Sequence, residues 1–112
     1  MCIRDRLIAY NNRDIEGFLK PFSEDVKGYN YPTQLFFDGK EKMRVMYSRL
    51  FDACPELHCT TISRTVFGNT VIDKERVTGM GNNKNVPYFL AIYKIESEKI
   101  TEVRFISYLS DQ

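Results

Sequence analysis

The chain has 112 residues, enough for one domain with a hydrophobic core but too few for a second. Its 16 Lys and Arg balance 15 Asp and Glu, with no run of like charges, so binding to nucleic acid or to an anionic membrane is not expected. The three cysteines form no CxxC pair, and no apolar segment approaches the roughly 20 residues of a membrane-spanning helix, which favours a soluble, cytoplasmic protein without a disulfide framework or a zinc site.

The first six residues, Met1-Cys2-Ile3-Arg4-Asp5-Arg6, look like the translated adapter read-through that can begin open reading frames in metagenomic assemblies. We therefore expect residues 1–6 to be a non-native leader and residues 7–112 to form a single domain. Leu7, Ile8 and Tyr10 would then be the end of a first helix whose beginning is missing.

A short helix is predicted at about residues 12–22, because Asp14 and Glu16 place negative charge in its first turn, where the helix dipole favours it. The apolar residues at helical spacing are Ile15, Phe18, Leu19 and Phe22. The next segment, residues 23–31, is predicted to be a turn and a short, irregular extended stretch, since Pro32 restricts Tyr31 to extended conformations.

The strongest amphipathic pattern covers residues 39–53 and predicts a second helix. Its buried face would consist of Met43, Met46, Tyr47, Leu50 and Phe51. Cys54-Pro55 ends the pattern, and strand-like runs follow: a hairpin over 57–79, a polar loop over 79–85, and strands over 86–96 and 99–108. Helices followed by an antiparallel meander predict an α+β fold, in which N-terminal helices cover a curved antiparallel sheet and form a cone with an internal pocket.

The hairpin turns at Gly68-Asn69, a dipeptide that tolerates the backbone of a tight turn, and this fixes a predicted register. The predicted pairs are Val66 with Val71, Arg64 with Asp73, Ile62 with Glu75 and Thr60 with Val77. One face would then carry His58, Ile62, Arg64, Val66, Val71, Asp73, Glu75 and Val77. Charged groups among branched aliphatic side chains suit the lining of an apolar pocket better than a solvated surface.

The catalytic candidates on this face are Glu75, Asp73, Arg64 and His58. Glu75 faces no cation directly across the hairpin, so burial should raise its pKa and suit it to act as a general acid or base. Arg64 and Asp73 are predicted to form a cross-strand ion pair, with a ligand-binding role as the alternative. His58 is either a partly exposed residue at the start of its strand or a group that reaches a ligand.

Aromatic side chains with hydroxyl groups are the candidates for ligand binding, although such residues are also ordinary core material. They are Tyr29, Tyr31, Tyr47 and Tyr88. The expected ligand is a small molecule of apolar or mixed polarity. No cofactor is expected, because the sequence contains neither a phosphate-binding glycine loop nor a cluster of metal ligands.

Several short motifs, in their order and spacing, resemble the nuclear transport factor 2-like superfamily, and more closely its SnoaL-like and ketosteroid isomerase-like branch. They are Asn12-Arg13-Asp14-Ile15-Glu16-Gly17-Phe18-Leu19, Ser23-Glu24-Asp25-Val26, Asp38-Gly39-Lys40-Glu41, Phe67-Gly68-Asn69-Thr70-Val71-Ile72-Asp73-Lys74-Glu75, and Tyr93-Lys94-Ile95 with Lys99-Ile100 and Val103. The resemblance covers roughly residues 7–107 and implies the cone-shaped fold.

Ketosteroid isomerases use an aspartate base together with a tyrosine and a protonated acid that bind the oxyanion. The resemblance places the base position at Asn30, the tyrosine position at Arg6 and the second acid near Ala91. The isomerase catalytic set is therefore not matched, and an amide at position 30 cannot accept a proton at neutral pH.

Three classes of function remain open: an isomerase, dehydratase or hydrolase type of enzyme, a non-catalytic ligand-binding domain, and a dimerisation module whose cavity is filled by side chains. A homodimer is expected through the outer sheet face, because related domains commonly pair there and this face carries few charges. The residues predicted on it include Thr61, Ser63, Thr65, Ile72 and Thr78.

Overall fold

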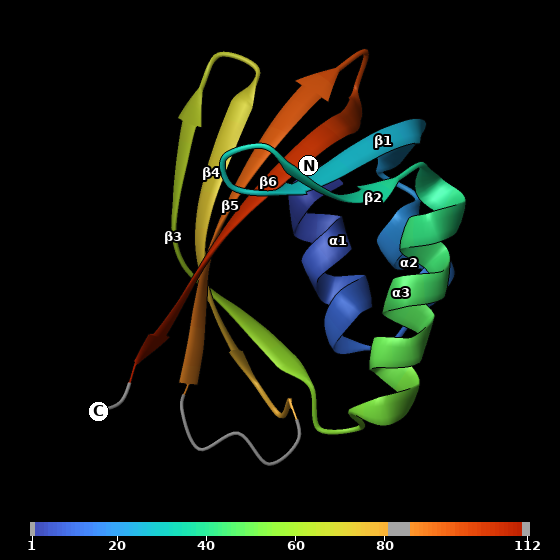
Figure 1. Cartoon of the computed structure of the whole chain (residues 1–112), viewed down its shortest axis with the longest axis vertical. Helices are drawn as coiled ribbons and strands as arrows, with labels where there is room; N and C mark the ends of the chain where they lie inside the picture. Colours follow the sequence, from blue (N-terminus) through green and yellow to red (C-terminus); the bar gives the residue numbers. More distant parts are fainter. Residues whose placement is uncertain (1, 81–85, 111–112) are drawn as a thin grey trace.

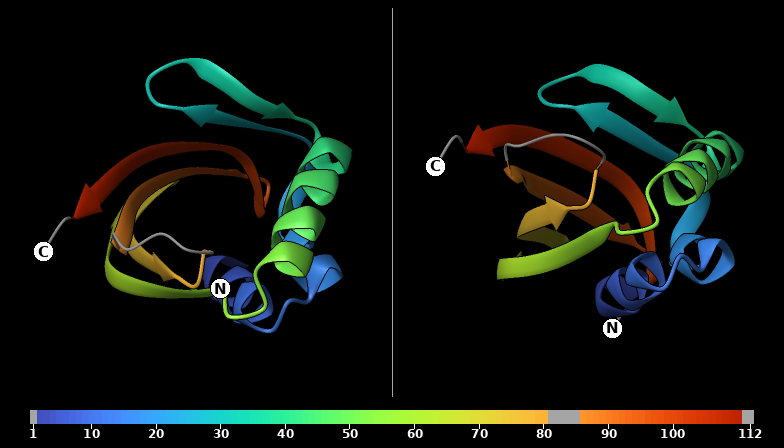
Figure 2. Two further views of the ribbon diagram at one scale, coloured as in Figure 1. Left: turned by 60° about the horizontal axis from the view of Figure 1, so that its bottom comes forward. Right: turned by 90° about the horizontal axis from the view of Figure 1, so that it is seen from below.

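The computed structural model describes residues 2–80 and 86–110, with the backbone alone for residues 2, 86, 87 and 108–110. The elements in chain order are α1 (Cys2–Asn11), α2 (Ile15–Leu19), β1 (Phe22–Asn30), β2 (Gln34–Asp38), α3 (Lys40–Ala53), β3 (His58–Phe67), β4 (Thr70–Thr78), β5 (Val86–Glu96) and β6 (Lys99–Ser110). The sheet curls, and all three helices lie on its concave side (Figures 1 and 2). The structure thus confirms the predicted α+β fold, while residues 81–85 of the predicted loop lie outside the described part.

The six strands form one sheet in the order β2-β1-β6-β5-β4-β3. The predicted antiparallel meander from β3 to β6 is confirmed, but β1 joins β6 in parallel and β2 extends the sheet beyond β1. The segment predicted to be irregular is therefore the nine-residue strand β1. Its ladder to β6 is interrupted between Phe22 and Lys27, where Ser23, Glu24 and Asp25 break the alternation that identifies a strand in a sequence.

The helices differ from the prediction mainly at the N-terminus. The helix predicted over 12–22 is only α2, whose N-cap Asp14 accepts a hydrogen bond from the backbone N–H of Gly17. Residues 2–11 form α1, and within the segment predicted to be a leader Ile3 and Arg6 are buried in the domain. Whether those residues are native stays a prediction. The helix predicted over 39–53 is confirmed as α3, and none of the described helices is long and apolar enough to cross a membrane.

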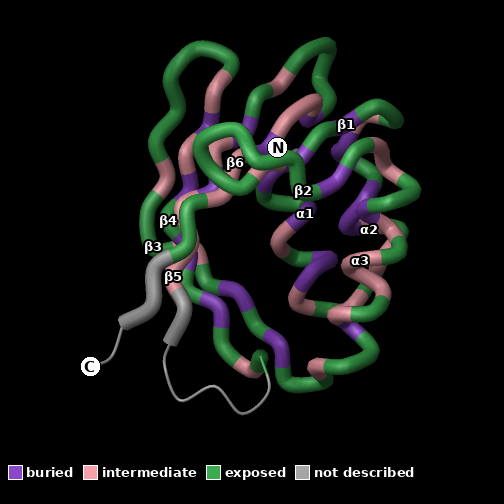
Figure 3. Tube along the Cα trace, in the orientation of Figure 1, coloured by how far each residue is buried: buried purple, intermediate pink, exposed green. Residues whose placement is uncertain are grey.

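An aromatic cluster joins the three helices and forms the centre of the core. Phe18 of α2 lies 4.7 Å from Tyr47 of α3 and 5.6 Å from Tyr10 of α1, measured between ring centres. Phe22 and Phe51 complete the cluster. Such tilted and edge-on pairs contribute roughly 0.5–1.5 kcal/mol each beyond the burial of their surface. Figure 3 shows the resulting pattern, in which buried residues lie where helices and sheet face one another.

The predicted hairpin register holds from the turn to Arg64, which pairs with Asp73. A bulge between Thr61 and Ser63 then shifts it, so that Glu75 lies opposite Thr61 and Val77 opposite Cys59. The predicted pairs of Ile62 with Glu75 and of Thr60 with Val77 are therefore wrong.

The bulge exchanges the two faces of the first half of β3, because side chains alternate between faces with a period of two and one extra residue reverses the alternation. Cys59 is consequently buried on the inner face, whereas His58 is exposed on the outer one. The prediction that His58 shares the face of Glu75 is wrong, as is the placement of Thr61 on the outer face.

Asn11 at the end of α1 holds the shifted strand in place. Its side-chain amide donates to the carbonyl oxygen of Cys59 at 3.0 Å and accepts from the backbone N–H of Cys59 at 2.8 Å. Because β3 is the edge strand, Asn11 pairs backbone groups that no further strand reaches.

Deleting Ile62 tests the bulge. Because Thr61 and Ser63 already pair with the adjacent Glu75 and Lys74, the deletion should leave an uninterrupted ladder in which Cys59 still faces inward, and should change the free energy of unfolding by less than about 1 kcal/mol. Deletion of Thr65, in the regular part of the ladder, is the matched control, because it breaks the register of Arg64 with Asp73 and should cost about 2–4 kcal/mol. Urea denaturation measures both variants, and equal losses would contradict the assignment of Ile62 as the extra residue.

Candidate functional site

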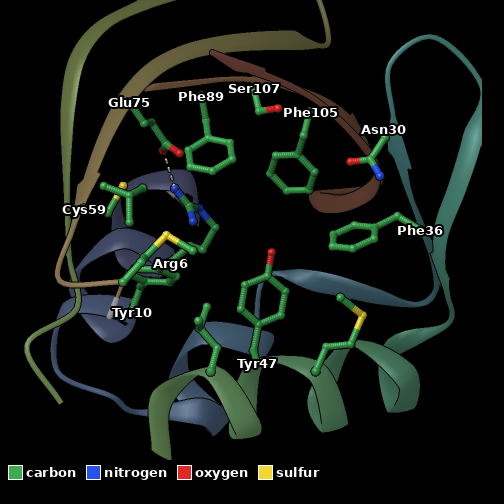
Figure 4. A pocket seen from close by; sticks show the side chains of 14 residues that line it. Arg6, Tyr10, Asn30, Phe36, Tyr47, Cys59, Glu75, Phe89, Phe105 and Ser107 are labelled. Atoms are coloured by element: carbon green, nitrogen blue, oxygen red, sulfur yellow. Dashed lines mark hydrogen bonds and ion pairs between the residues drawn. The ribbon is translucent and has the colours of Figure 1, made fainter. Parts of the chain in front are cut away.

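A partly open cavity of about 380 Å³ lies between the concave face of the sheet and helices α1 and α3 (Figure 4). Its apolar lining consists of Phe36, Met46, Leu50, Val77, Met80, Phe89 and Phe105. Its polar lining consists of Arg6, Tyr10, Asn30, Tyr47, Cys59, Glu75 and Ser107. Glu75, Arg6 and Cys59 lie together at one end, whereas the exposed Asn30 lies at the other and the exposed Ser107 lies between Phe89 and Phe105, so the cavity leads from a mouth near Asn30 to a buried charged end.

The charged end is an ion pair between α1 and β4. Nη2 of Arg6 donates to Oε2 of Glu75 at 2.7 Å, and each side chain is only 6% exposed. Arg6 lies on the same face of α1 as Ile3 and Tyr10, three and four residues away, and both are buried. Glu75 points towards α1 because side chains alternate along β4, and Val71, Asp73, Glu75 and Val77 are all buried on its inner face.

Two aromatic rings support the buried guanidinium. Its central carbon lies 5.2 Å from the ring centre of Tyr93 and 5.9 Å from that of Phe18, within the range of cation–π attraction. Burial acts to lower the pKa of Arg6, but Tyr93 and Glu75 raise that pKa above its ordinary value, so Arg6 remains a cation.

Glu75 has the opposite balance. Burial raises the pKa of its carboxyl group, the charge of Arg6 opposes this, and the net direction is upward from the ordinary value. Burial also raises the pKa of the Cys59 thiol and of the Tyr47 hydroxyl, each to about 12, so both groups are neutral hydrogen-bond donors near neutral pH. Among the residues that line the cavity, Glu75 carries the carboxyl group. Its pKa is raised towards the pH range in which enzymes exchange protons.

The predicted ion pair between Arg64 and Asp73 is confirmed. Nε of Arg64 donates to Oδ1 of Asp73 at 2.6 Å and Nη2 donates to Oδ2 at 2.8 Å, while Asp73 is fully buried. Neither residue lines the cavity. Arg64 and Asp73 therefore have a structural role as an ion pair between β3 and β4, and the candidate site does not include them.

The remaining candidates lie mostly outside the cavity. His58 is exposed on the other face, and Tyr31 is 57% exposed. Tyr29 packs under the guanidinium of Arg104, 4.2 Å from its central carbon to the ring centre. Tyr88 precedes the cavity-lining Phe89 in β5 and therefore lies on the outer face. Tyr47 and Glu75 are the two sequence-predicted site residues that line the cavity.

Two groups among the lining residues that the sequence analysis missed differ in the reason they were missed. Phe89, Phe105 and Ser107 follow from the alternation of β5 and β6, and their register was available in the sequence. Arg6 and Cys59 were not accessible in this way, because one lies in the presumed leader and the other is turned inward by the bulge. Within residues 2–80 and 86–110, no group of three His, Cys, Asp or Glu side chains is placed to hold a metal ion.

The ion pair predicts an asymmetry between its two halves. Glu75→Leu removes the hydrogen-bond acceptor of an arginine that cannot lose its charge and leaves that cation buried, which should cost about 3–5 kcal/mol of stability. Arg6→Met leaves a carboxyl group that can take up a proton, and should cost less. The double variant should be more stable than Glu75→Leu alone, as measured by urea denaturation. Equal and additive losses would contradict the coupling.

The same carboxyl group predicts a pH dependence of stability. Its pKa in the folded protein lies above the ordinary value of 4.5, so the protonated form is favoured by folding. The contribution to stability is fully present below pH 4.5 and is lost as the pH rises through the raised pKa. The stability of the parent protein relative to Glu75→Gln should therefore fall as the pH is raised from about 4 to 8. A relative stability that rises with pH would contradict this sign.

Comparison with known proteins agrees with the observed fold. The chain is similar to an uncharacterized cystatin fold protein from Novosphingobium aromaticivorans, with a TM-score of 0.86 and 24% identity over 94% of each chain. An NTF2-like protein of unknown function from Cytophaga hutchinsonii matches with a TM-score of 0.76 and 16% identity, over 97% of this chain and 87% of that one. An LEH-like epoxide hydrolase from M. tuberculosis matches with a TM-score of 0.76 and 13% identity, over 96% and 80%.

These identities are low, so the likeness shows a shared fold and not a shared reaction. No curated protein matches the chain. Residues 3–103, however, match the SnoaL-like domain family over most of the sequence. The chain belongs to the SnoaL-like domain family, and it shares its fold with a solved NTF2-like protein.

Proposed function

We propose that this domain binds a small, largely apolar molecule in its cavity and carries out acid/base chemistry on it, of the isomerase, dehydratase or hydrolase type, with Glu75 transferring the proton. The observation that supports this most strongly is a carboxyl group of raised pKa, 4% exposed, at the buried end of a largely apolar cavity. A general acid or base works best when its pKa lies near the working pH.

The neighbouring groups have complementary roles in this proposal. Arg6 donates to Oε2 of Glu75 and the thiol of Cys59 also hydrogen-bonds to this carboxyl group, so the group that exchanges a proton with the ligand is held in a fixed position. The remaining N–H groups of Arg6 can donate to an oxygen atom on which negative charge develops. The Tyr47 hydroxyl points into the cavity from α3 and, being neutral, can donate a further hydrogen bond (Figure 4).

The similar structures share the fold, include a protein named for one of these reactions, and leave the substrate open. One is named an epoxide hydrolase, and another is described as a protein with a ketosteroid isomerase-like fold from Catenulispora acidiphila. The isomerase mechanism itself is not part of the proposal. Asn30 lines the mouth of the cavity and carries an amide in place of the base, whereas the proton-transferring group proposed here lies on β4.

A second candidate is a non-catalytic ligand-binding domain with the same cavity. The short ion pair favours it, because a carboxylate held by Arg6 at 2.7 Å is stabilised in its charged form and gives up that stabilisation when it takes a proton. Both candidates place the ligand in the same cavity. They differ in whether Glu75 gains or loses a proton while the ligand is bound.

Hydrogen–deuterium exchange separates the two candidates. The probe is 4-phenylcyclohexanone in deuterated buffer, and NMR follows exchange at the carbons beside the carbonyl group. The protein should accelerate this exchange, and Glu75→Gln should reduce the acceleration about 100-fold or more while the ketone still binds. Glu56→Gln, at an exposed position, is the matched control and should leave the rate unchanged. Binding without acceleration would favour the non-catalytic domain.

We also propose a homodimer through the outer face of the sheet. The bulge removes Thr61 from this face but leaves Thr65 and Ile72 paired on it, and Ile92 pairs with Ile72 from β5. Ile72→Arg should convert a dimer into a monomer in sedimentation at micromolar concentration. Val45→Arg, at an exposed position on α3, is the control and should leave the dimer intact. A monomeric parent protein would contradict the proposal.

A further inference from the structure

We infer that the cavity takes an uncharged molecule of one or two rings, bound through an oxygen atom that accepts hydrogen bonds from the guanidinium group of Arg6. This inference rests on the proposed function for the site itself, and adds the chemical class of the ligand. Three features of the cavity carry it: the unused donors of Arg6, the balance of charge at the buried end, and the volume.

The first feature is the set of donors that Arg6 does not use. A guanidinium group has five N–H groups, and among the described residues its hydrogen-bond acceptor is Glu75. Nε is buried without a partner in that part of the chain, although the residue is only 5% exposed. Unpaired buried donors cost roughly 1–3 kcal/mol each, so a ligand that offers an acceptor to the free side of the guanidinium removes part of that cost.

The other polar groups at this end point to the same chemistry. Burial raises the pKa of Tyr10, Tyr47 and Cys59, so all three keep their protons; the Cys59 thiol hydrogen-bonds to Glu75, and the two tyrosine hydroxyl groups can donate to a ligand. A ligand group entering between these side chains therefore meets mainly donors. A carbonyl, ester or epoxide oxygen fits this surrounding, whereas a purely donating group such as an ammonium does not.

The second feature is charge. Arg6 and Glu75 compensate each other within hydrogen-bond distance, and the nearby Arg64 and Asp73 form a second closed pair outside the cavity. An added ion at the buried end would have no counterion among these groups, and its desolvation would be uncompensated. The ligand is therefore neutral.

The third feature is size. At the packing density of protein interiors, a cavity of about 380 Å³ holds roughly 280 Å³ of ligand, which corresponds to roughly 15 non-hydrogen atoms. Phe89 and Phe105 supply aromatic walls along it, and Phe36 lies edge-on to Phe105 at 6.2 Å (Figure 4). One or two rings fit within this space, whereas a four-ring molecule would extend out of the open mouth.

The test compares matched probes by calorimetric titration at neutral pH. Arg6→Met should weaken binding of 4-phenylcyclohexanone by about 10- to 100-fold, the value of a hydrogen bond to a charged donor. It should leave binding of phenylcyclohexane, which has no oxygen, within about threefold. Arg4→Met is the control, because Arg4 lies exposed on the same helix, and it should change neither affinity.

The remaining measurements use the parent protein alone. The anion 4-phenylcyclohexanecarboxylate and the cation 4-phenylcyclohexylammonium should bind at least about tenfold more weakly than the ketone. The four-ring androst-4-ene-3,17-dione should also bind more weakly. The infrared carbonyl band of the bound ketone should move to lower wavenumber, as expected for a hydrogen bond to a guanidinium, and this readout remains if Arg6→Met does not fold.

Three results would overturn the inference: ketone affinity that does not depend on Arg6 in a folded variant together with an unshifted carbonyl band, preference for a charged probe, or preference for the steroid. These binding results are independent of turnover. Selective binding without proton exchange would contradict only the catalytic proposal. Proton exchange on a charged or four-ring substrate would contradict only the inferred class of ligand.

Discussion

The buried ion pair between Arg6 and Glu75 is the interaction on which the rest of the site depends. It ties α1 to β4, the neighbour of the edge strand β3, and places a cation and a carboxylate, each 6% exposed, at the closed end of an apolar cavity. An isolated buried charge costs several kcal/mol, and Arg6 cannot lose its charge, so the buried cation requires the acceptor that Glu75 supplies. The pair thus provides polar groups at a position surrounded by the aromatic rings of Phe18, Tyr93 and Phe89, which would otherwise form an apolar core.

The bulge in β3 decides which side chains surround that pair. One inserted residue turns Cys59 inward and His58 outward, so the wall beside Glu75 is a neutral thiol and not a titratable imidazole. Asn11 secures this arrangement from the helix by pairing with the backbone of Cys59 on the strand's open edge. Glu75 therefore has a cation on one side and weak neutral donors on the other, and the competition between burial and Arg6 sets its pKa.

Membership of the SnoaL-like domains explains the scaffold and leaves the chemistry to individual residues. The cone supplies a cavity, an entrance lined by exposed polar residues and a curved aromatic wall. Asn30 lies near the mouth, while the proton-exchanging group proposed here lies at the opposite end on β4.

The sequence by itself determined the elements that repeat regularly. Helical spacing located α3, alternation located β3 to β6, and Gly68-Asn69 fixed the pairing of Arg64 with Asp73 and the inward position of Glu75. These features are local, so propensity and periodicity report them. Only the tertiary structure decided the parallel pairing of β1 with β6, the bulge at Ile62 and the contact of Arg6 with Glu75, 69 residues apart. Each of these depends on which distant surface is available to bury a side chain or pair a backbone group, and no local pattern records that.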